Sequence, residues 1–129
     1  MASASDLTIF FDGACPLCRR EIAHYLARDT ARRLAAVDIV QDTGPLAALG
    51  VSQADALAVL HVQDGEGRVL TGAAAFLAIW DRLPRWRLLA RTIRALPGAA
   101  ALLERAYRVI APRRTRIVAA LCGDGRCAR

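Results

Sequence analysis

The sequence contains no lysine, few aromatic residues and no long hydrophobic run. All 18 basic residues are therefore arginine, and with 12 acidic residues they give a formal net charge of +6. An aromatic share of only 5% favours a helix-rich protein over an all-β sandwich. The longest uncharged windows, 69–80 and 43–54, are far shorter than the roughly 20 apolar residues that cross a bilayer as a helix. We therefore expect no transmembrane helix.

Several targeting and cofactor signals are also missing. The N-terminal residues lack the basic start and continuous apolar centre of a secretory signal, so we expect a cytoplasmic protein. There is no glycine-rich phosphate loop and no dinucleotide fingerprint, so no bound cofactor is expected. In a reducing cytosol the 4 cysteines are poor candidates for structural disulfides. A close cysteine pair is then better interpreted as catalytic, redox-sensing or metal-binding.

The arginines are spread along helical patterns and are not accompanied by an aromatic platform for bases. We therefore predict solvated helix faces and no specific nucleic-acid binding. A sequence pI near 10.1 also allows weak contact with anionic surfaces. One alternative interpretation is thus a subunit that docks an arginine-rich helical surface on a membrane or an acidic partner.

At 129 residues the chain has the usual size of one domain. The apolar run 7–11 ends at Asp12-Gly13 and predicts a buried strand. A helical pattern follows from Pro16 to about residue 28, and 34–40 predicts a second strand. Because strand, helix and strand follow one another, these two strands should be parallel and joined by a right-handed crossover.

The next segment predicts an antiparallel hairpin followed by a helix. Glycines near 44 and 50 bracket one short helix, and Ser52 with Asp55 resembles a capping box. Residues 57–62 predict a third strand, and a glycine-containing turn leads to a predicted fourth strand at 68–71. Thr71 should then cap a helix over 72–82.

The remainder predicts added helices over 84–96, 98–110 and about 112–121, each opening near proline or glycine. The expected organisation is therefore one domain over 1–129. It has a core at about 6–82, a helical extension at about 84–121 and a tail at 122–129.

The chemistry concentrates in Cys15-Pro16-Leu17-Cys18, where the first strand gives way to a helix. Proline is favoured at the first helical position, so Pro16 makes Cys15 the cap residue and puts Cys18 in the first turn. Unpaired N–H groups and the helix dipole stabilise negative charge on sulfur there. We predict that Cys15, the outer of the two sulfurs, attacks a partner disulfide and that Cys18 resolves the mixed disulfide.

Three neighbouring residues are predicted to support the pair. Arg19 adds positive potential, although salt screens an exposed charge. Asp12 can shape the loop by accepting backbone N–H bonds, with proton transfer as the second interpretation. Gly13 is expected to supply a backbone conformation that other residues avoid.

Zinc binding is the main alternative. A structural zinc site needs about four ligands, and Cys122 and Cys127 could complete a set with Cys15 and Cys18. The chain would then be a non-catalytic interaction module. The unequal spacing of the two pairs argues against it, and a frayed tail or an auxiliary dithiol also fits Cys122 and Cys127.

The segment Asp12-Gly13-Ala14-Cys15-Pro16-Leu17-Cys18 resembles the signature of the DCC family of thiol-disulfide oxidoreductases, which are small bacterial proteins. The segment 58–80 is similar to the family's central hairpin and helix, and 106–111 with Arg113 or Arg114 to its terminal region. The resemblance implies a thioredoxin-like α/β fold, and the predicted elements fit a four-stranded mixed sheet in the order 2-1-3-4. It also implies disulfide exchange with a protein or a small-molecule thiol.

The sequence departs from thioredoxins at one place. They carry a proline, in cis, just before the third strand, where this chain has Gln53-Ala54-Asp55-Ala56. How a partner docks beside the dithiol is therefore left open.

Overall fold

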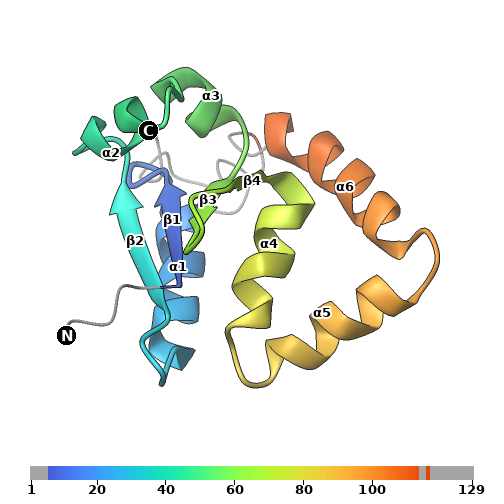
Figure 1. Ribbon diagram of the computed structural model, residues 1–129. Coiled ribbons are helices and arrows are strands. Elements are labelled where there is room, and N and C mark those ends of the chain that lie inside the picture. The colour runs from blue at the N-terminus through green and yellow to red at the C-terminus, as the bar shows by residue number, and fades with distance from the viewer. Residues whose placement is uncertain (1–5, 114–115, 117–129) are drawn as a thin grey trace.

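The structure is a computed structural model that describes residues 6–113 and residue 116. A mixed sheet of four strands forms its centre, in the order β2-β1-β3-β4 (Figure 1). The strands are β1 (Leu7–Phe11), β2 (Leu34–Asp38), β3 (His61–Asp64) and β4 (Val69–Thr71). β1 pairs with β2 in parallel and with β3 antiparallel, and β3 pairs antiparallel with β4. This is the predicted strand order.

Helices cover both faces of the sheet. They are α1 (Pro16–Arg28), α2 (Gly44–Ala48), α3 (Gln53–Ala58), α4 (Gly72–Asp81), α5 (Trp86–Ala95) and α6 (Ala99–Ile110), followed by a short 3₁₀ turn, η1 (Ala111–Arg113). Leu7 and Ile9 share one core with buried side chains of α1 and α4. Phe10 points to the other face and shares a second core with Leu46 of α2 and Ala56 of α3. The chain therefore has the thioredoxin-like α/β fold that the sequence predicts.

The predicted bounds of the third strand, 57–62, were wrong. Residues 53–58 form α3, and β3 begins only at His61. The cap that the sequence indicated decides this, because the Ser52 hydroxyl accepts a hydrogen bond from the Asp55 amide at 3.1 Å. The apolar residues at 57 and 58 thus complete a helix, and the segment holds two short helices where one was expected.

The second strand is shorter than the predicted 34–40. It ends at Asp38, whose Oδ1 accepts a hydrogen bond from the Val40 amide at 3.0 Å. An aspartate that binds the backbone two residues later forms an Asx turn, which ends a strand.

The cap of α4 also differs from the prediction. The Thr71 side chain makes no capping hydrogen bond. The Glu104 carboxylate, on α6, accepts a hydrogen bond from the Ala73 amide at 2.8 Å instead. α5 and α6 occupy the predicted segments, whereas most of the helix predicted over 112–121 lies outside the described residues.

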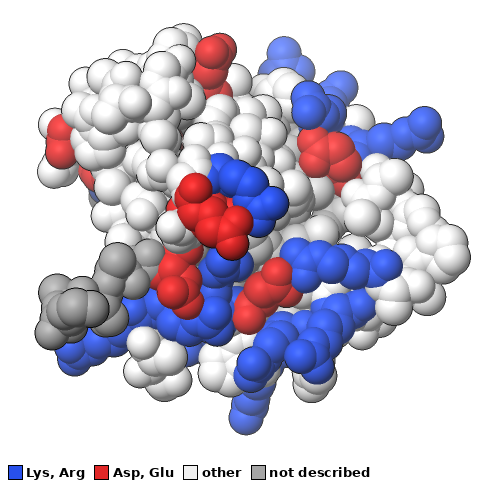
Figure 2. Space-filling model, in the orientation of Figure 1, with Lys and Arg blue, Asp and Glu red and all other residues white. Residues whose placement is uncertain are grey.

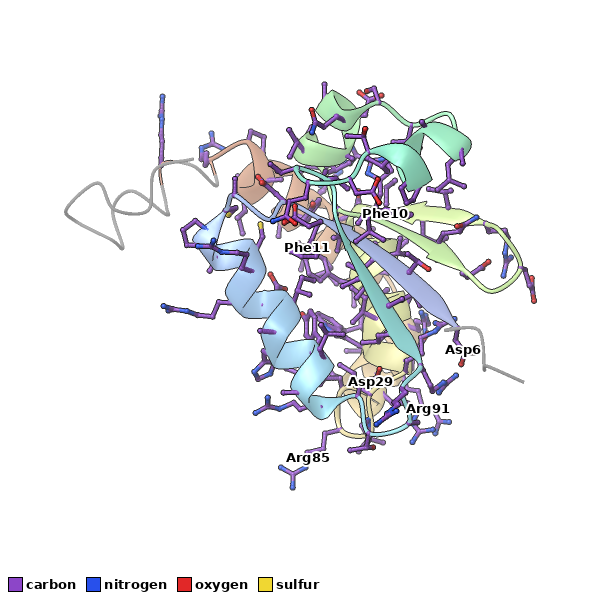
Figure 3. All side chains as sticks on the ribbon, turned by 90° about the vertical axis from the view of Figure 1, so that its left-hand side faces the viewer. Asp6, Phe10, Phe11, Asp29, Arg85 and Arg91 are labelled. Carbon is purple, nitrogen blue, oxygen red and sulfur yellow. The ribbon has the colours of Figure 1, made fainter. Side chains whose placement is uncertain are left out.

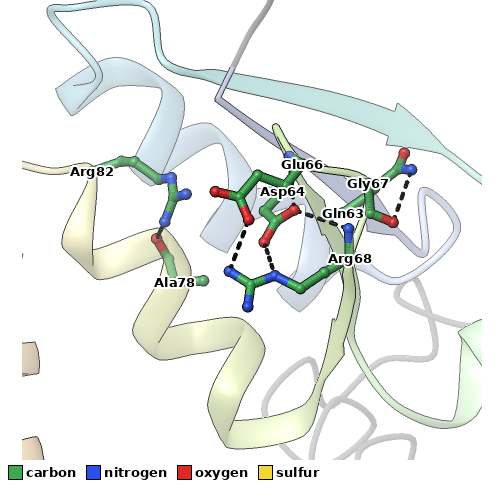
Figure 4. Close-up of polar contacts among 7 residues, drawn as sticks. All are labelled: Gln63, Asp64, Glu66, Gly67, Arg68, Ala78 and Arg82. Carbon is green, nitrogen blue, oxygen red and sulfur yellow. Dashed lines mark hydrogen bonds and ion pairs between the residues drawn. The ribbon is translucent and has the colours of Figure 1, made fainter.

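The hairpin between β3 and β4 has its own polar cluster (Figure 4). The Asp64 carboxylate accepts hydrogen bonds from the amides of Glu66 and Arg68, both at 2.9 Å, and pairs with the Arg68 guanidinium at 3.1 Å. Hydrogen bonds from the Arg68 and Glu66 amides are among the causes that lower the pKa of Asp64, the Arg68 bond being the largest. The predicted glycine turn is therefore organised by one aspartate.

Basic side chains gather over the lower part of the face in Figure 2, with acidic side chains among them. The upper left of that view, over α2 and α3, shows hardly any basic side chain. Within the described part of the chain, no helix is both long and apolar enough to span a bilayer.

Candidate functional site

The loop from β1 to α1 holds the cysteine pair at the carboxyl end of the central strand. Phe10 and Phe11 mark this end of the sheet in Figure 3, while Asp6 and Asp29 lie toward the opposite end. Cys15 is the N-cap of α1, with extended backbone (φ −89°, ψ 116°), and Pro16 opens the helix. The predicted start of the helix is therefore confirmed.

The Cys15 sulfur lies against the open end of α1. Its Sγ accepts a hydrogen bond from the Cys18 amide at 3.4 Å, as a cap side chain does. The helix dipole and this N–H favour negative charge on the sulfur. Cys15 and Cys18 lie in the same helical turn.

The two cysteines differ in exposure, and in the direction opposite to the prediction. Cys15 is only 2% exposed, whereas Cys18 is half-buried. The expectation that Cys15 is the outer sulfur is therefore wrong in this structure. The cap position turns the Cys15 side chain back toward its own helix, where it contacts the Cys18 amide and not solvent.

Asp12 shapes the loop before the cysteines. Its side chain is buried, and Oδ1 accepts a hydrogen bond from the Ala14 amide at 3.0 Å. Its backbone carbonyl accepts a hydrogen bond from the Cys15 amide at 3.2 Å. These contacts give Asp12 the predicted role in the loop, while its role in proton transfer stays a prediction.

Gly13 is needed for space and not for an unusual backbone angle. Its φ does not lie in the positive range that favours glycine. A Cβ atom on Gly13 would overlap the carboxylate of Asp38, at the end of β2. The Gly13 amide also donates a hydrogen bond to Asp38 Oδ1 at 3.1 Å. The predicted reason for the glycine was therefore wrong. Glycine is needed at this position because of its close contact with Asp38, a residue 25 positions later.

The side chain of Arg19 is exposed, and its backbone amide donates a hydrogen bond to the Cys15 carbonyl at 3.0 Å.

His61, which the sequence places in the apolar third strand, is a buried core histidine. Its Nδ1 lies 2.9 Å from the Val59 carbonyl.

A pocket of about 170 Å³ opens beside Cys18. Its lining comes from β1, α1, α3, α4, α6 and the segments next to them: Phe10, Phe11, Asp12, Leu17, Cys18, Glu21, Ile22, Tyr25, Ala56, Leu60, Phe76, Tyr107, Ile110 and Ala111. Cys15 is not part of the lining. As far as the described residues form it, the lining is mostly apolar, with two carboxyl groups and no arginine or histidine.

Sequence reasoning did not single out Glu21, which lies three positions after Cys18 and lines the same pocket. Residues three apart on a helix share a face, so this spacing was the available signal. The Tyr25 hydroxyl donates a hydrogen bond to Glu21 Oε1 at 2.9 Å, and the Trp80 indole donates to the Tyr25 oxygen at 3.1 Å.

Burial is the largest influence on Glu21 and raises the pKa of its carboxyl above the ordinary value of 4.5. The hydrogen bond from Tyr25 and the charge of His24 oppose this rise. Burial also raises the pKa of Tyr25, and the neighbouring Glu21 charge adds to that rise.

Among the described residues, no group of three or more histidine, cysteine, aspartate or glutamate side chains could hold a metal ion. Cys122 and Cys127 lie outside the described residues. The four-cysteine zinc site thus stays a prediction.

The family model of the DCC1-like thiol-disulfide oxidoreductases matches residues 9–120. The chain belongs to this family. The match runs from β1 through the cysteine pair, the sheet and α6, so it covers the fold as well as the motif. No curated protein matches the chain, and no solved structure matches it. Membership in this oxidoreductase family makes thiol-disulfide chemistry the activity to examine at Cys15 and Cys18.

Proposed function

We propose that the protein exchanges disulfides with a disulfide-bearing protein or a small-molecule thiol through Cys15 and Cys18, without a bound cofactor. The observation that carries the proposal is the placement of both cysteines at the start of α1, where Cys15 Sγ accepts a hydrogen bond from the Cys18 amide. Membership in the DCC1-like family supports it.

The exchange requires only sulfur chemistry. In the reducing direction a thiolate of the pair attacks the partner disulfide, one partner sulfur leaves as a thiolate, and a mixed disulfide forms. The second cysteine then attacks the first, and the other partner sulfur leaves. The protein loses two electrons to the partner and ends with a Cys15–Cys18 disulfide, and the reverse sequence oxidises a dithiol partner.

Turnover of a protein disulfide by the full chain, with dithiothreitol as the electron source, tests the proposal. Cys15→Ser and Cys18→Ser should each abolish catalysed reduction, because each leaves only one sulfur of the pair. Cys122→Ser is the matched control and should keep the activity. Activity that survives in both Cys15→Ser and Cys18→Ser would contradict the proposal.

The same preparations separate the zinc alternative. Protein purified without chelator should carry no stoichiometric zinc if the pair is a redox dithiol. One zinc per chain that is lost in Cys122→Ser would instead support a metal-bound module.

A further inference from the structure

Of the two cysteines, Cys18 is the one that lies at the pocket. It lines the pocket, while Cys15 is 2% exposed and lies against the end of α1. A partner sulfur that enters the pocket therefore meets Cys18 first.

We propose that Cys18 forms the first bond with the partner, that the pocket holds an apolar group attached to the partner sulfur, and that Cys15 is the resolving cysteine. This rests on the proposed function and deepens it, since it reverses the order of attack and names a substrate class. That class is disulfides with an aromatic or branched aliphatic group close to sulfur.

The size and lining of the pocket argue for such a group. A volume of about 170 Å³ is close to that of a cavity of about 150 Å³ that holds a benzene molecule. The lining includes Phe11, Leu60 and Phe76, which lose water-exposed apolar surface when an apolar group enters.

The charges around the pocket argue against anionic groups. Among the described residues, Asp12 and Glu21 are the carboxyl groups of its lining, and none of the lining side chains is basic. An anionic substituent would therefore meet two acids and no cation from this part of the chain. A small anionic disulfide should be a poor partner for the same reason.

The steps balance as follows. The Cys18 thiolate attacks the partner sulfur that carries the apolar group, the partner S–S bond breaks, and the other sulfur leaves with the electron pair and takes a proton from water. The Cys15 thiolate, one helical turn away, then attacks Cys18 Sγ. The Cys15–Cys18 bond forms, and the apolar thiolate leaves and is protonated by water. Two electrons pass from the protein to the partner disulfide.

Methanethiosulfonates test this directly, because each transfers a thioalkyl group to a thiolate and releases methanesulfinate. The probes are the benzyl, hydroxyethyl and sulfonatoethyl reagents, and each rate is divided by the rate of the same reagent with free cysteine. In Cys15→Ser, the benzyl reagent should modify Cys18 at least tenfold faster than the hydroxyethyl reagent, and the sulfonatoethyl reagent should be slowest. In Cys18→Ser, Cys15 should react at least tenfold more slowly than Cys18 does in Cys15→Ser.

A pocket variant and a surface variant, each built on Cys15→Ser, form the matched pair. Ala111→Leu adds volume at the pocket lining and should reduce the benzyl preference toward that of the hydroxyethyl reagent. Ala101→Leu makes the same change on the exposed side of α6 and should leave the preference unchanged. The hydroxyethyl rate and the unfolding temperature show whether each variant is folded.

Equal normalised rates for the three reagents at Cys18, or faster modification of Cys15 than of Cys18, would overturn this inference. Each rate is followed by mass spectrometry at the peptide that carries the remaining cysteine of the pair, so Cys122 and Cys127 do not contribute to it, and it does not depend on turnover. If the wild-type protein does not reduce a protein disulfide, but Cys18 still reacts faster with the benzyl reagent, the proposed function is contradicted and the pocket assignment stands.

Discussion

The amide of Gly13 donates a hydrogen bond to the Asp38 carboxylate at 3.1 Å, so the loop before the cysteines is tied to the end of the neighbouring parallel strand. The Asp38 carboxylate fills the space that a side chain on Gly13 would need. The position of Cys15 and Cys18 thus depends on a contact between their loop and the end of β2.

Gly13→Ala should lower the free energy of unfolding by about 1–3 kcal/mol, the usual cost of forcing extra volume into a packed site. Gly65→Ala is the matched control, because its Cβ would approach nothing closer than 3.6 Å and its φ is not in the positive range. Denaturant unfolding measures both. Equal stability of the two variants would show that Asp38 moves aside at no cost.

The cap that α6 gives to α4 should be measurable by substitution of Glu104. Its carboxylate accepts the Ala73 amide at 2.8 Å at the start of α4. Glu104→Ala should lower the free energy of unfolding by about 1 kcal/mol, as loss of a helix cap does. Glu104→Gln keeps an acceptor oxygen and should lose less. A Glu104→Gln variant as unstable as Glu104→Ala would contradict capping by the side-chain oxygen.

Tyr107 connects α6 to the backbone before β3. Its hydroxyl accepts a hydrogen bond from the Leu60 amide. Tyr107→Phe keeps the ring but removes this hydrogen-bond partner of the part-buried amide, which should cost about 1 kcal/mol. Hydrogen exchange at the Leu60 amide should also become faster in Tyr107→Phe. Unchanged exchange would mean that the hydroxyl does not protect this amide.

Burial raises the pKa of Glu21 in the folded state above its ordinary value of 4.5. The folded protein then holds this proton at a pH where the unfolded chain has released it, so stability falls as the pH rises from that ordinary value through the raised pKa. Glu21→Gln, which is neutral at every pH, should be more stable than the wild type at neutral pH, and the difference should vanish in acid. Thermal unfolding across this range measures it.

The control for this pH dependence is Glu66→Gln. The Glu66 side chain is 79% exposed, so the same substitution there should change stability little at any pH. A Glu21→Gln variant that follows the wild type at every pH would show that ionisation of Glu21 does not affect folding.

Local signals predicted the elements that position the cysteines. Pro16 after Cys15 gave the start of α1 because proline fits the first helical position, and the structure has this cap. The apolar run 57–62 was predicted as a strand, although residues 57 and 58 end a helix, because a short apolar run fits a strand and a helix equally well. The hydrogen bond from the Asp55 amide to the Ser52 hydroxyl favours the helix over 53–58.

The surroundings of the site could not be predicted in the same way. The overlap at Gly13 involves Asp38, and the cap of α4 involves Glu104, 31 residues beyond Ala73. The pocket joins Cys18 to Phe76 and Tyr107, which are far away in sequence. Periodicity places a residue on a face, but it does not say which distant side chain will meet it there.

The redox state of Cys15 and Cys18 after turnover tests the central claim most directly. Reduced wild-type protein is first mixed with less than one equivalent of a protein disulfide. The reaction is then quenched in acid and digested, and the peptide that contains both cysteines is measured by mass spectrometry. A Cys15–Cys18 disulfide should form in proportion to the substrate reduced. Substrate that is reduced while both thiols stay free, or no reduction with zinc bound at the pair, would contradict it.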